Sequence, residues 1–423
     1  MSRGMVPSLF SICVNFLVDN FECVEALGDV ESSIRRTICS ELIAKNKLNG
    51  DAFQAIAEPG IEALELVDCA EVTQDQLSHA LKALVPAGLR YLLLHHAGRC
   101  FGSTAIKSLT SMNDAKLFAL SIGGAYLLKD QDAVSLIQSL AGSLTSLEFK
   151  ACPLLNGGYC RALQENYSSS GTGTLVELSM ENLTLAKDDL LLFASDALRH
   201  LRSLALRSME SVDDEVVCKF LDNVEELEGI ELSFNHNISD DSLSAIRSCN
   251  GKGKLRSLQL CNLKSLTEVG LETLFTFDIE GLPSPPRLSK LNLSGCAHDA
   301  ITDNIVELAC TASSMKKGAT SVPSRHSSLG GLVHVNVSGS SCTDYSMESL
   351  AAASAGTLEE LNVSFSPKIT DKGLGYLVSK ASHQFTRIHV WGCAQITDEF
   401  LDGHSRCEDS TFEIVGTWMK KSM

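Results

Sequence analysis

Residues 358–377 read LEELNVSFSPKITDKGLGYL, and this stretch decides the fold. It opens with the pattern L-x-x-L-x-L-x-x-(C/N/small), in which apolar and polar residues alternate as they do in a strand. The turn Ile369-Thr370-Asp371 follows, and Leu374 and Leu377 then lie three residues apart, as on one face of a helix. Thr370 is suited to cap this helix, and Asp371 suits the positive end of the helix dipole. The stretch therefore predicts one strand followed by one helix.

The same pattern recurs along most of the chain, at intervals of 26 to 33 residues with a single interval of 44. Its twelve occurrences begin at Ile61, Leu89, Leu117, Leu144, Leu175, Leu201, Leu227, Leu255, Leu288, Leu332, Leu358 and Phe385. A period of this length with this spacing of leucines is typical of leucine-rich repeats. Because neither the strand nor the helix buries its apolar face alone, the units must stack. We therefore predict an α/β leucine-rich-repeat solenoid, a horseshoe of about twelve strand-helix repeats, over residues 61–402.

Composition narrows the class of protein. The formal net charge of the 423 residues is −17, which argues against strong direct binding to nucleic acid or to an anionic membrane. No apolar run is long enough to span a bilayer. The 15 cysteines include no C-x-x-C motif, so reduced thiols in the nucleus or cytoplasm are expected, with no metal or cofactor. Four of them share one repeat position, where a buried packing role is predicted: Cys69, Cys152, Cys296 and Cys393.

Three segments rich in Ser, Gly, Pro and Lys break the period, namely 164–174, 278–287 and 311–331. We expect them to be loops. Residues 403–423 follow the last repeat and are expected to form a C-terminal tail.

Residues 1–60 do not repeat, and we expect a small helical module there. Within it, residues 8–17 read SLFSICVNFL. On a helix, one continuous apolar face would consist of Leu9, Ile12, Cys13, Phe16 and Leu17. Two roles are open for this face. It could cap the exposed end of the first repeat, or it could insert into a groove on a partner.

Ser8-Leu9-x-x-x-Cys13-x-x-x-Leu17 resembles the elongin C-binding box, as found in elongin A. The continuation over residues 18–48, with Gly28-Asp29-Val30, resembles the leucine-rich-repeat subunit of the fungal nucleotide-excision-repair ubiquitin ligase even more. The repeats themselves resemble the cysteine-containing leucine-rich repeats of F-box substrate receptors. The fungal subunit carries a long basic extension before the box, which does not precede it here, so properties of that extension are not expected.

The resemblance implies a non-catalytic substrate-recognition subunit of a cullin-RING ubiquitin ligase, with nucleotide excision repair as the suggested pathway. It implies an elongin C or Skp-type adaptor and a cullin as partners. The adaptor would contact Ser8, Leu9, Ile12, Cys13, Phe16 and Leu17. Two alternatives stay open: an F-box-like receptor in general ubiquitin-dependent protein catabolism, and a leucine-rich-repeat scaffold outside any ligase whose N-terminal helix is only a cap.

An unknown target protein would lie on the strand face of the repeats. The residues that alternate with the leucines there include six acidic and four basic side chains, which is unlike a phosphate-binding channel. The candidate anchors are large side chains of this face, most of them near one end of the repeats or the other: Tyr91, His95, Arg207, Arg387, His389 and Trp391. Trp391 could instead pack under the tail, which contains Phe412, Ile414, Val415 and Trp418.

Overall fold

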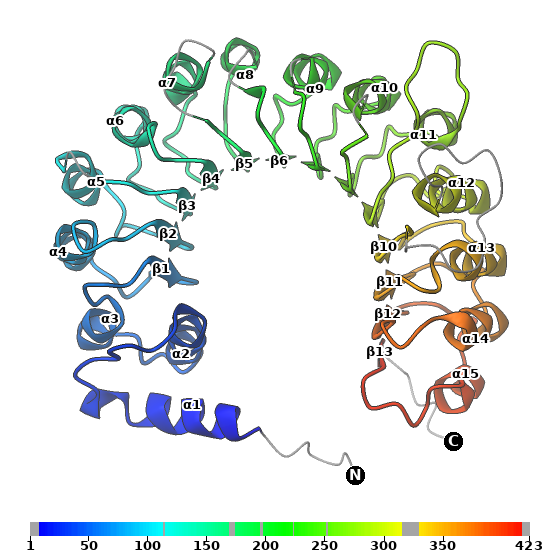
Figure 1. Cartoon of the computed structure of the whole chain (residues 1–423), viewed down its shortest axis with the longest axis horizontal. Coiled ribbons are helices and arrows are strands. Elements are labelled where there is room, and N and C mark those ends of the chain that lie inside the picture. The colour runs from blue at the N-terminus through cyan, green and yellow to red at the C-terminus, as the bar shows by residue number, and fades with distance from the viewer. Residues whose placement is uncertain are drawn as a thin grey trace. The chain divides into compact units, whose positions relative to one another are not determined.

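The computed structural model describes residues 8–112, 115–168, 174–194, 198–222, 224–250, 253–314 and 330–416. The chain divides into two compact units, residues 1–200 and 201–423, and each is described by itself. The cartoon in Figure 1 labels most elements of both.

The first unit begins with three helices and a 3-10 turn and continues with alternating strands and helices. The opening elements are α1 (Leu9–Asp19), the turn (Phe21–Cys23), α2 (Ser32–Ala44) and α3 (Gly50–Ile56). They are followed by β1 (Ala63–Leu66), α4 (Gln74–Leu84), β2 (Tyr91–Leu94), α5 (Ser103–Thr110), β3 (Ala119–Gly123), α6 (Asp130–Leu140), β4 (Ser146–Lys150), α7 (Gly158–Tyr167), β5 (Glu177–Glu181) and α8 (Lys187–Phe193).

The second unit continues the same alternation with shorter strands. Its elements are β6 (Ser203–Arg207), α9 (Asp214–Leu221), β7 (Gly229–Glu231), α10 (Asp240–Cys249), β8 (Ser257–Gln259), α11 (Glu268–Phe275), β9 (Lys290–Asn292), α12 (Asp303–Ser314), β10 (His334–Asn336), α13 (Asp344–Ser354), β11 (Glu360–Asn362), α14 (Asp371–Lys380), β12 (Arg387–His389), α15 (Asp398–Gly403) and β13 (Glu413–Val415).

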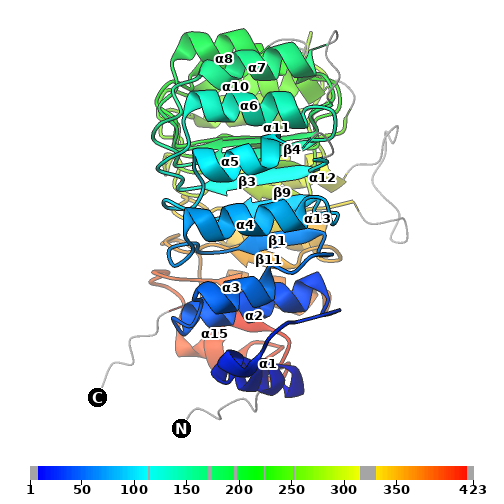
Figure 2. The ribbon, with the colours of Figure 1, turned by 90° about the vertical axis from the view of Figure 1, so that its left-hand side faces the viewer.

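Within each unit the strands pair in parallel and in sequence order, and the helices lie on one side of them (Figures 1 and 2). The leucines of the pattern are buried between strand and helix, as Leu64 and Leu66 are in β1 and Leu361 is in β11. Their burial is what holds each unit together, since aliphatic side chains leave water on both elements at once. The predicted leucine-rich-repeat solenoid of the α/β class is confirmed.

The tail contributes a strand that the leucine pattern did not predict. β13 pairs in parallel with β12, and the Val390 N–H donates to the Val415 carbonyl at 2.9 Å. The residues of β13 thus cover the hydrogen-bonding edge that β12 would otherwise expose. Phe412, just before it, packs against the rings of Phe385 and His404.

Two of the predicted loops are shorter than expected because the preceding helix runs into them. Residues 164–167 belong to α7, where the Tyr167 hydroxyl donates to the Leu144 carbonyl at 3.1 Å, and residues 311–314 belong to α12. Residues 169–173 and 315–329, which make up most of the remainder, lie outside the described residues.

The turn after each strand explains the small residue at the end of the pattern. In every repeat from β2 to β12, the residue five positions after the start of the strand has a left-handed backbone. Gly295 and Gly392 are two examples, and glycine adopts this conformation without strain. In three of these repeats the next residue is a buried cysteine, Cys152, Cys296 or Cys393, whose thiol donates to a carbonyl of the preceding repeat. Cys393 donates to Val363 at 3.2 Å, and Cys152 donates to Ile122 at 3.6 Å. The predicted packing role of the repeat cysteines fits this arrangement.

The Ile-Thr-Asp turns join consecutive repeats. The Asp303 carboxylate accepts hydrogen bonds from the Thr343 backbone at 2.8 Å and from the Thr343 hydroxyl at 2.7 Å. Asp344 accepts equivalent bonds from Thr370 at 2.8 and 2.6 Å. Each aspartate therefore lies at the start of its own helix and also holds the capping residue of the next helix.

Candidate functional site

Helix α1 is apolar on nearly all sides, and the structure determines which side is buried. The Ser8 hydroxyl caps it by accepting from the Ser11 N–H at 3.1 Å. Val14 and Val18 are buried on the side that packs on α2. The opposite side faces outward: Leu9 is 77% exposed and Phe16 is 72% exposed. Exposed apolar side chains gathered on one short helix are typical of a protein-binding surface.

Lysines that follow α2 fix the orientation of α1. The Lys45 ammonium donates to the Asp19 carboxylate and to the Asn15 side-chain carbonyl, both at 2.9 Å. The Lys47 ammonium donates to the Asp19 carbonyl at 2.6 Å and so satisfies an open carbonyl at the C-terminal end of the helix. These contacts hold the side of α1 that carries Val14 and Val18 against α2 and leave the side with Leu9 and Phe16 free.

The cap of the first repeat is formed by α2, which packs on β1, and not by the outer face of α1. Ile38, Cys39 and Leu42 of α2 are buried. Behind them, buried Arg35 donates to the Ile56 carbonyl at 2.9 Å and to the Gly28 carbonyl at 2.8 Å. Gly28 itself has a left-handed backbone (φ 58°), which gives a structural reason for glycine at this position.

The predicted adaptor residues form the outer face of α1. Leu9, Ile12, Cys13 and Phe16 are exposed, Leu17 is half-buried, and Ser8 is exposed at the helix start. Phe10, which the predicted face did not include, is 49% exposed and extends the surface. Helical spacing alone could not show that Phe10 is exposed while Val14 is buried, because both residues are apolar.

Two predicted target-binding residues lie in the first unit. Tyr91 at the start of β2 is exposed and meets the edge of Phe118, with ring centroids 6.2 Å apart. Phe118 is also exposed, and the Arg90 guanidinium lies 5.7 Å from its ring centroid. Sequence reasoning missed Phe118 because it precedes the strand instead of alternating within it. His95 lies apart from this cluster, beside Gly123 of β3.

The other predicted residues lie in the second unit. Arg207 forms an ion pair with Glu231 at 3.3 Å. Arg387 donates to Glu413 at 2.9 Å, so β13 supplies its partner. Trp391 is 38% exposed next to Phe365, whose ring lies over Gly392 and which has a left-handed backbone (φ 58°). Bulky residues rarely adopt this conformation, and it holds the Phe365 ring outward.

The alternative for Trp391 is packing under the tail, through Phe412, Ile414, Val415 and Trp418. Phe412, Ile414 and Val415 leave Trp391 exposed, and Trp418 lies outside the described residues.

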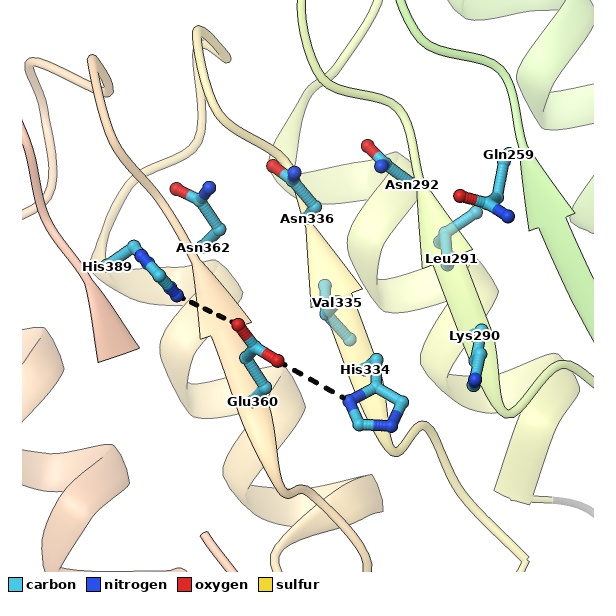
Figure 3. Close-up of a pocket in the computed structure, with 10 residues that line it drawn as sticks. All are labelled: Gln259, Lys290, Leu291, Asn292, His334, Val335, Asn336, Glu360, Asn362 and His389. Carbon is cyan, nitrogen blue, oxygen red and sulfur yellow. Dashed lines mark hydrogen bonds and ion pairs between the residues drawn. The ribbon is translucent and has the colours of Figure 1, made fainter. Parts of the chain in front are cut away.

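A hollow of about 340 Å³ lies on the strand face of the second unit, over β8 to β12 (Figure 3). It is lined by Gln259, Lys290, Leu291, Asn292, His334, Val335, Asn336, Glu360, Asn362 and His389. Figure 3 shows Glu360 between the two histidines. Its carboxylate lies 2.8 Å from His389 Nε2 and 3.9 Å from His334 Nδ1. Of the predicted target-binding residues, only His389 lines this hollow.

Other kinds of chemistry would need metal-ligating, nucleophilic or membrane-spanning groups in the described part of the chain. No cluster of three His, Cys, Asp or Glu side chains there could hold a metal ion. Burial raises the pKa of the Cys310 thiol to about 12 and that of Cys296 to about 11, which makes these thiols poor nucleophiles. None of the described helices is long and apolar enough to cross a membrane.

Comparison with known proteins adds two similarities. The chain is 24% identical over 380 residues to the DNA repair protein rhp7 of Schizosaccharomyces pombe, and the match covers 88% of this chain and 56% of rhp7. The chain thus spans just over half the length of this curated relative. No protein-family model matches it. Its fold matches Rad7 in the crystal structure of the Rad7 and Elc1 complex in yeast, with a TM-score of 0.60, 16% identity and coverage of 97% of this chain and 98% of that chain. The chain is therefore similar to rhp7 in sequence and to Rad7 in fold, which confirms the resemblance that residues 8–48 and the repeats predict.

Proposed function

We propose that this chain is the substrate-recognition subunit of a cullin-RING ubiquitin ligase that acts in DNA repair in the nucleus. An elongin C-type adaptor binds the outer face of α1, and a target protein binds the strand face of the repeats. The chain itself is non-catalytic, and the cullin joins through the adaptor.

The exposed face of α1 carries this proposal. Leu9 and Phe16 are among the most exposed large apolar side chains in the described part of the chain. α1 is nevertheless held by Val14, Val18 and Lys45, so the exposure belongs to an ordered helix. An ordered helix that presents apolar side chains fits the helix-in-groove mode of recognition. The fold neighbour Rad7 was crystallised with Elc1, and rhp7 is a DNA repair protein, which supports the choice of adaptor and pathway.

The test is co-expression of the full chain with elongin C, and in parallel with a Skp-type adaptor, followed by affinity purification. We expect elongin C to copurify with the wild-type chain and to be lost when Leu9→Ala is combined with Cys13→Asp. A matched control is Val269→Ala, which changes an apolar residue that is 69% exposed on α11. Capture of the Skp-type adaptor alone would support the F-box-like alternative instead.

The scaffold alternative makes a different prediction. If the outer face of α1 were only a cap, deletion of residues 1–20 would unfold the first repeats and no adaptor would be recovered. Because α2 packs on β1, we expect the repeats to stay folded in this deletion while the adaptor is lost.

A further inference from the structure

The hollow on the strand face of the second unit presents hydrogen-bond donors. Asn292, Asn336 and Asn362 occupy matching positions on β9, β10 and β11, and these positions pair in register. Neighbouring strands are about 4.8 Å apart, so the row spans about 10 Å, or about three residues of an extended peptide.

The backbone fixes which way each amide points. Asn292 Oδ1 accepts from the Ser294 N–H at 3.1 Å, Asn336 Oδ1 from the Ser338 N–H at 3.1 Å, and Asn362 Oδ1 from the Ser364 N–H at 3.0 Å. The carbonyl oxygen must face the strand to accept this bond, so the Nδ2 group faces away from it. Within the described residues, none of the three Nδ2 groups has a hydrogen-bond partner.

The charged groups of the hollow favour the same kind of ligand. Lys290, on β9, forms no ion pair with any described residue. Glu360 is the only acid in the lining, and its carboxylate already faces His334 and His389. A ligand that enters here meets the amide donors and the Lys290 ammonium. Both imidazole rings already lie beside carboxylates, His389 beside Glu360 and His334 between Glu359 and Glu360.

We propose that this hollow binds a short, extended, acidic segment of the target protein. A carboxylate of the segment would pair with Lys290, and backbone carbonyls of the segment would accept from the asparagine Nδ2 groups. This inference rests on the proposed function, because it names the class of target segment that the strand face recognises. A surface that donates hydrogen bonds and offers an ammonium without an ion-pair partner complements a ligand made of acceptors and negative charge.

The test measures peptide binding to the full-length chain by fluorescence anisotropy. The probe is a fluorescein-labelled hexaglutamate peptide at about 0.15 M salt, where charges beyond about 8 Å are screened and the nearby groups dominate. A labelled Gly-Ser peptide of equal length and a six-nucleotide oligothymidylate serve as comparison probes. We expect hexaglutamate to bind more tightly than either of them.

Two variants isolate the proposed groups. Asn336→Asp keeps the oxygen that accepts from Ser338 but replaces the Nδ2 donor, and Lys290→Glu reverses the charge. We expect each to weaken hexaglutamate binding about tenfold or more. Gln384→Glu and Lys372→Glu make the same changes of charge at exposed positions outside the hollow and should leave binding unchanged.

The inference would be overturned if the wild-type chain bound hexaglutamate no better than the Gly-Ser peptide, if the oligothymidylate bound more tightly, or if the control variants weakened binding as much as the hollow variants. Adaptor binding, measured on the same preparations, separates the two proposals. Retained adaptor binding without peptide binding would overturn this inference and leave the proposed function standing.

Discussion

Leu9 and Val18 lie on the same helix, but their side chains have opposite surroundings. Leu9 is 77% exposed, whereas Val18 is fully buried on the side of α1 that packs on α2. Removing apolar atoms costs stability only where those atoms are buried in the folded chain. One helix therefore provides both a test of packing and a test of binding.

We expect Val18→Ala to lower the free energy of unfolding by about 1–3 kcal/mol, because it leaves a cavity between α1 and α2. Leu9→Ala should change it by less than about 0.5 kcal/mol. Thermal unfolding of the two variants under the same conditions checks this pair. Equal destabilisation by both would mean that the outer face of α1 is buried, and the docking surface would then have to be abandoned.

Helical spacing alone does not determine which face of α1 is buried. Helical spacing grouped Leu9, Ile12, Cys13 and Phe16 on one face, and the structure places them together and exposed. The spacing could not say which face is buried, because Val14 and Val18 form a second apolar face on the other side. That choice depends on Lys45 and Asp19, which meet only after α2 has folded back on α1.

At the scale of the elements, an aspartate at the start of several helices links its repeat to the next, as at Asp214, Asp240, Asp303, Asp344 and Asp371. Asp303 is one example, and it accepts from the Thr343 backbone and hydroxyl and from the Ser346 N–H at 3.1 Å. Burial alone would raise the pKa of its carboxyl, but the hydrogen bonds from Ser346 and Thr343 outweigh burial and lower it below 3.8. The native state therefore prefers the ionised carboxylate.

A pH dependence follows from the lowered pKa. The stabilisation is fully present above the unfolded-state pKa of about 3.9 and is lost as the pH falls through the lower folded-state pKa. We expect Asp303→Asn to cost about 1–2 kcal/mol at pH 7, which corresponds to a melting temperature lower by about 2–8 °C, and to cost less as the pH drops below 4.

Asp398 provides the matched control for this measurement. It occupies the same position in the last Ile-Thr-Asp turn, but it is exposed, and no described residue donates to its carboxylate. Asp398→Asn should leave the melting temperature unchanged both at pH 7 and below pH 4. A similar loss in the two variants would show that the effect comes from the helix start and not from the link between repeats.

The leucine period predicted the strand-helix pairs well, because the period directly reports which residues face the core. It predicted neither the aspartate link nor β13. The link joins Asp303 to Thr343 across 40 residues, so it depends on the stacking of repeats and not on local pattern. β13 lacks the leucines of the pattern and exists because β12 offers an open edge to pair with.

At the scale of the whole molecule, the net charge of −17 sets how the chain can approach DNA. Binding to the phosphate backbone requires clustered basic side chains, and the acids here outnumber the bases 52 to 35. We expect no binding of the isolated chain to duplex DNA tighter than about 10⁻⁴ M at physiological salt. Fluorescence anisotropy with a labelled duplex measures this. Tight binding that weakens steeply with salt would show a local basic surface that the charge balance conceals.

The central claim is that the outer face of α1 binds an elongin C-type adaptor, and the affinity of purified full-length chain for purified elongin C tests it most directly. Calorimetry should show binding by the wild-type chain, unchanged binding by Val269→Ala, and binding about a hundredfold weaker or more in the Leu9→Ala, Cys13→Asp variant, as expected for the centre of a protein interface. If the double variant bound elongin C as tightly as the wild-type chain did, the claim would be contradicted.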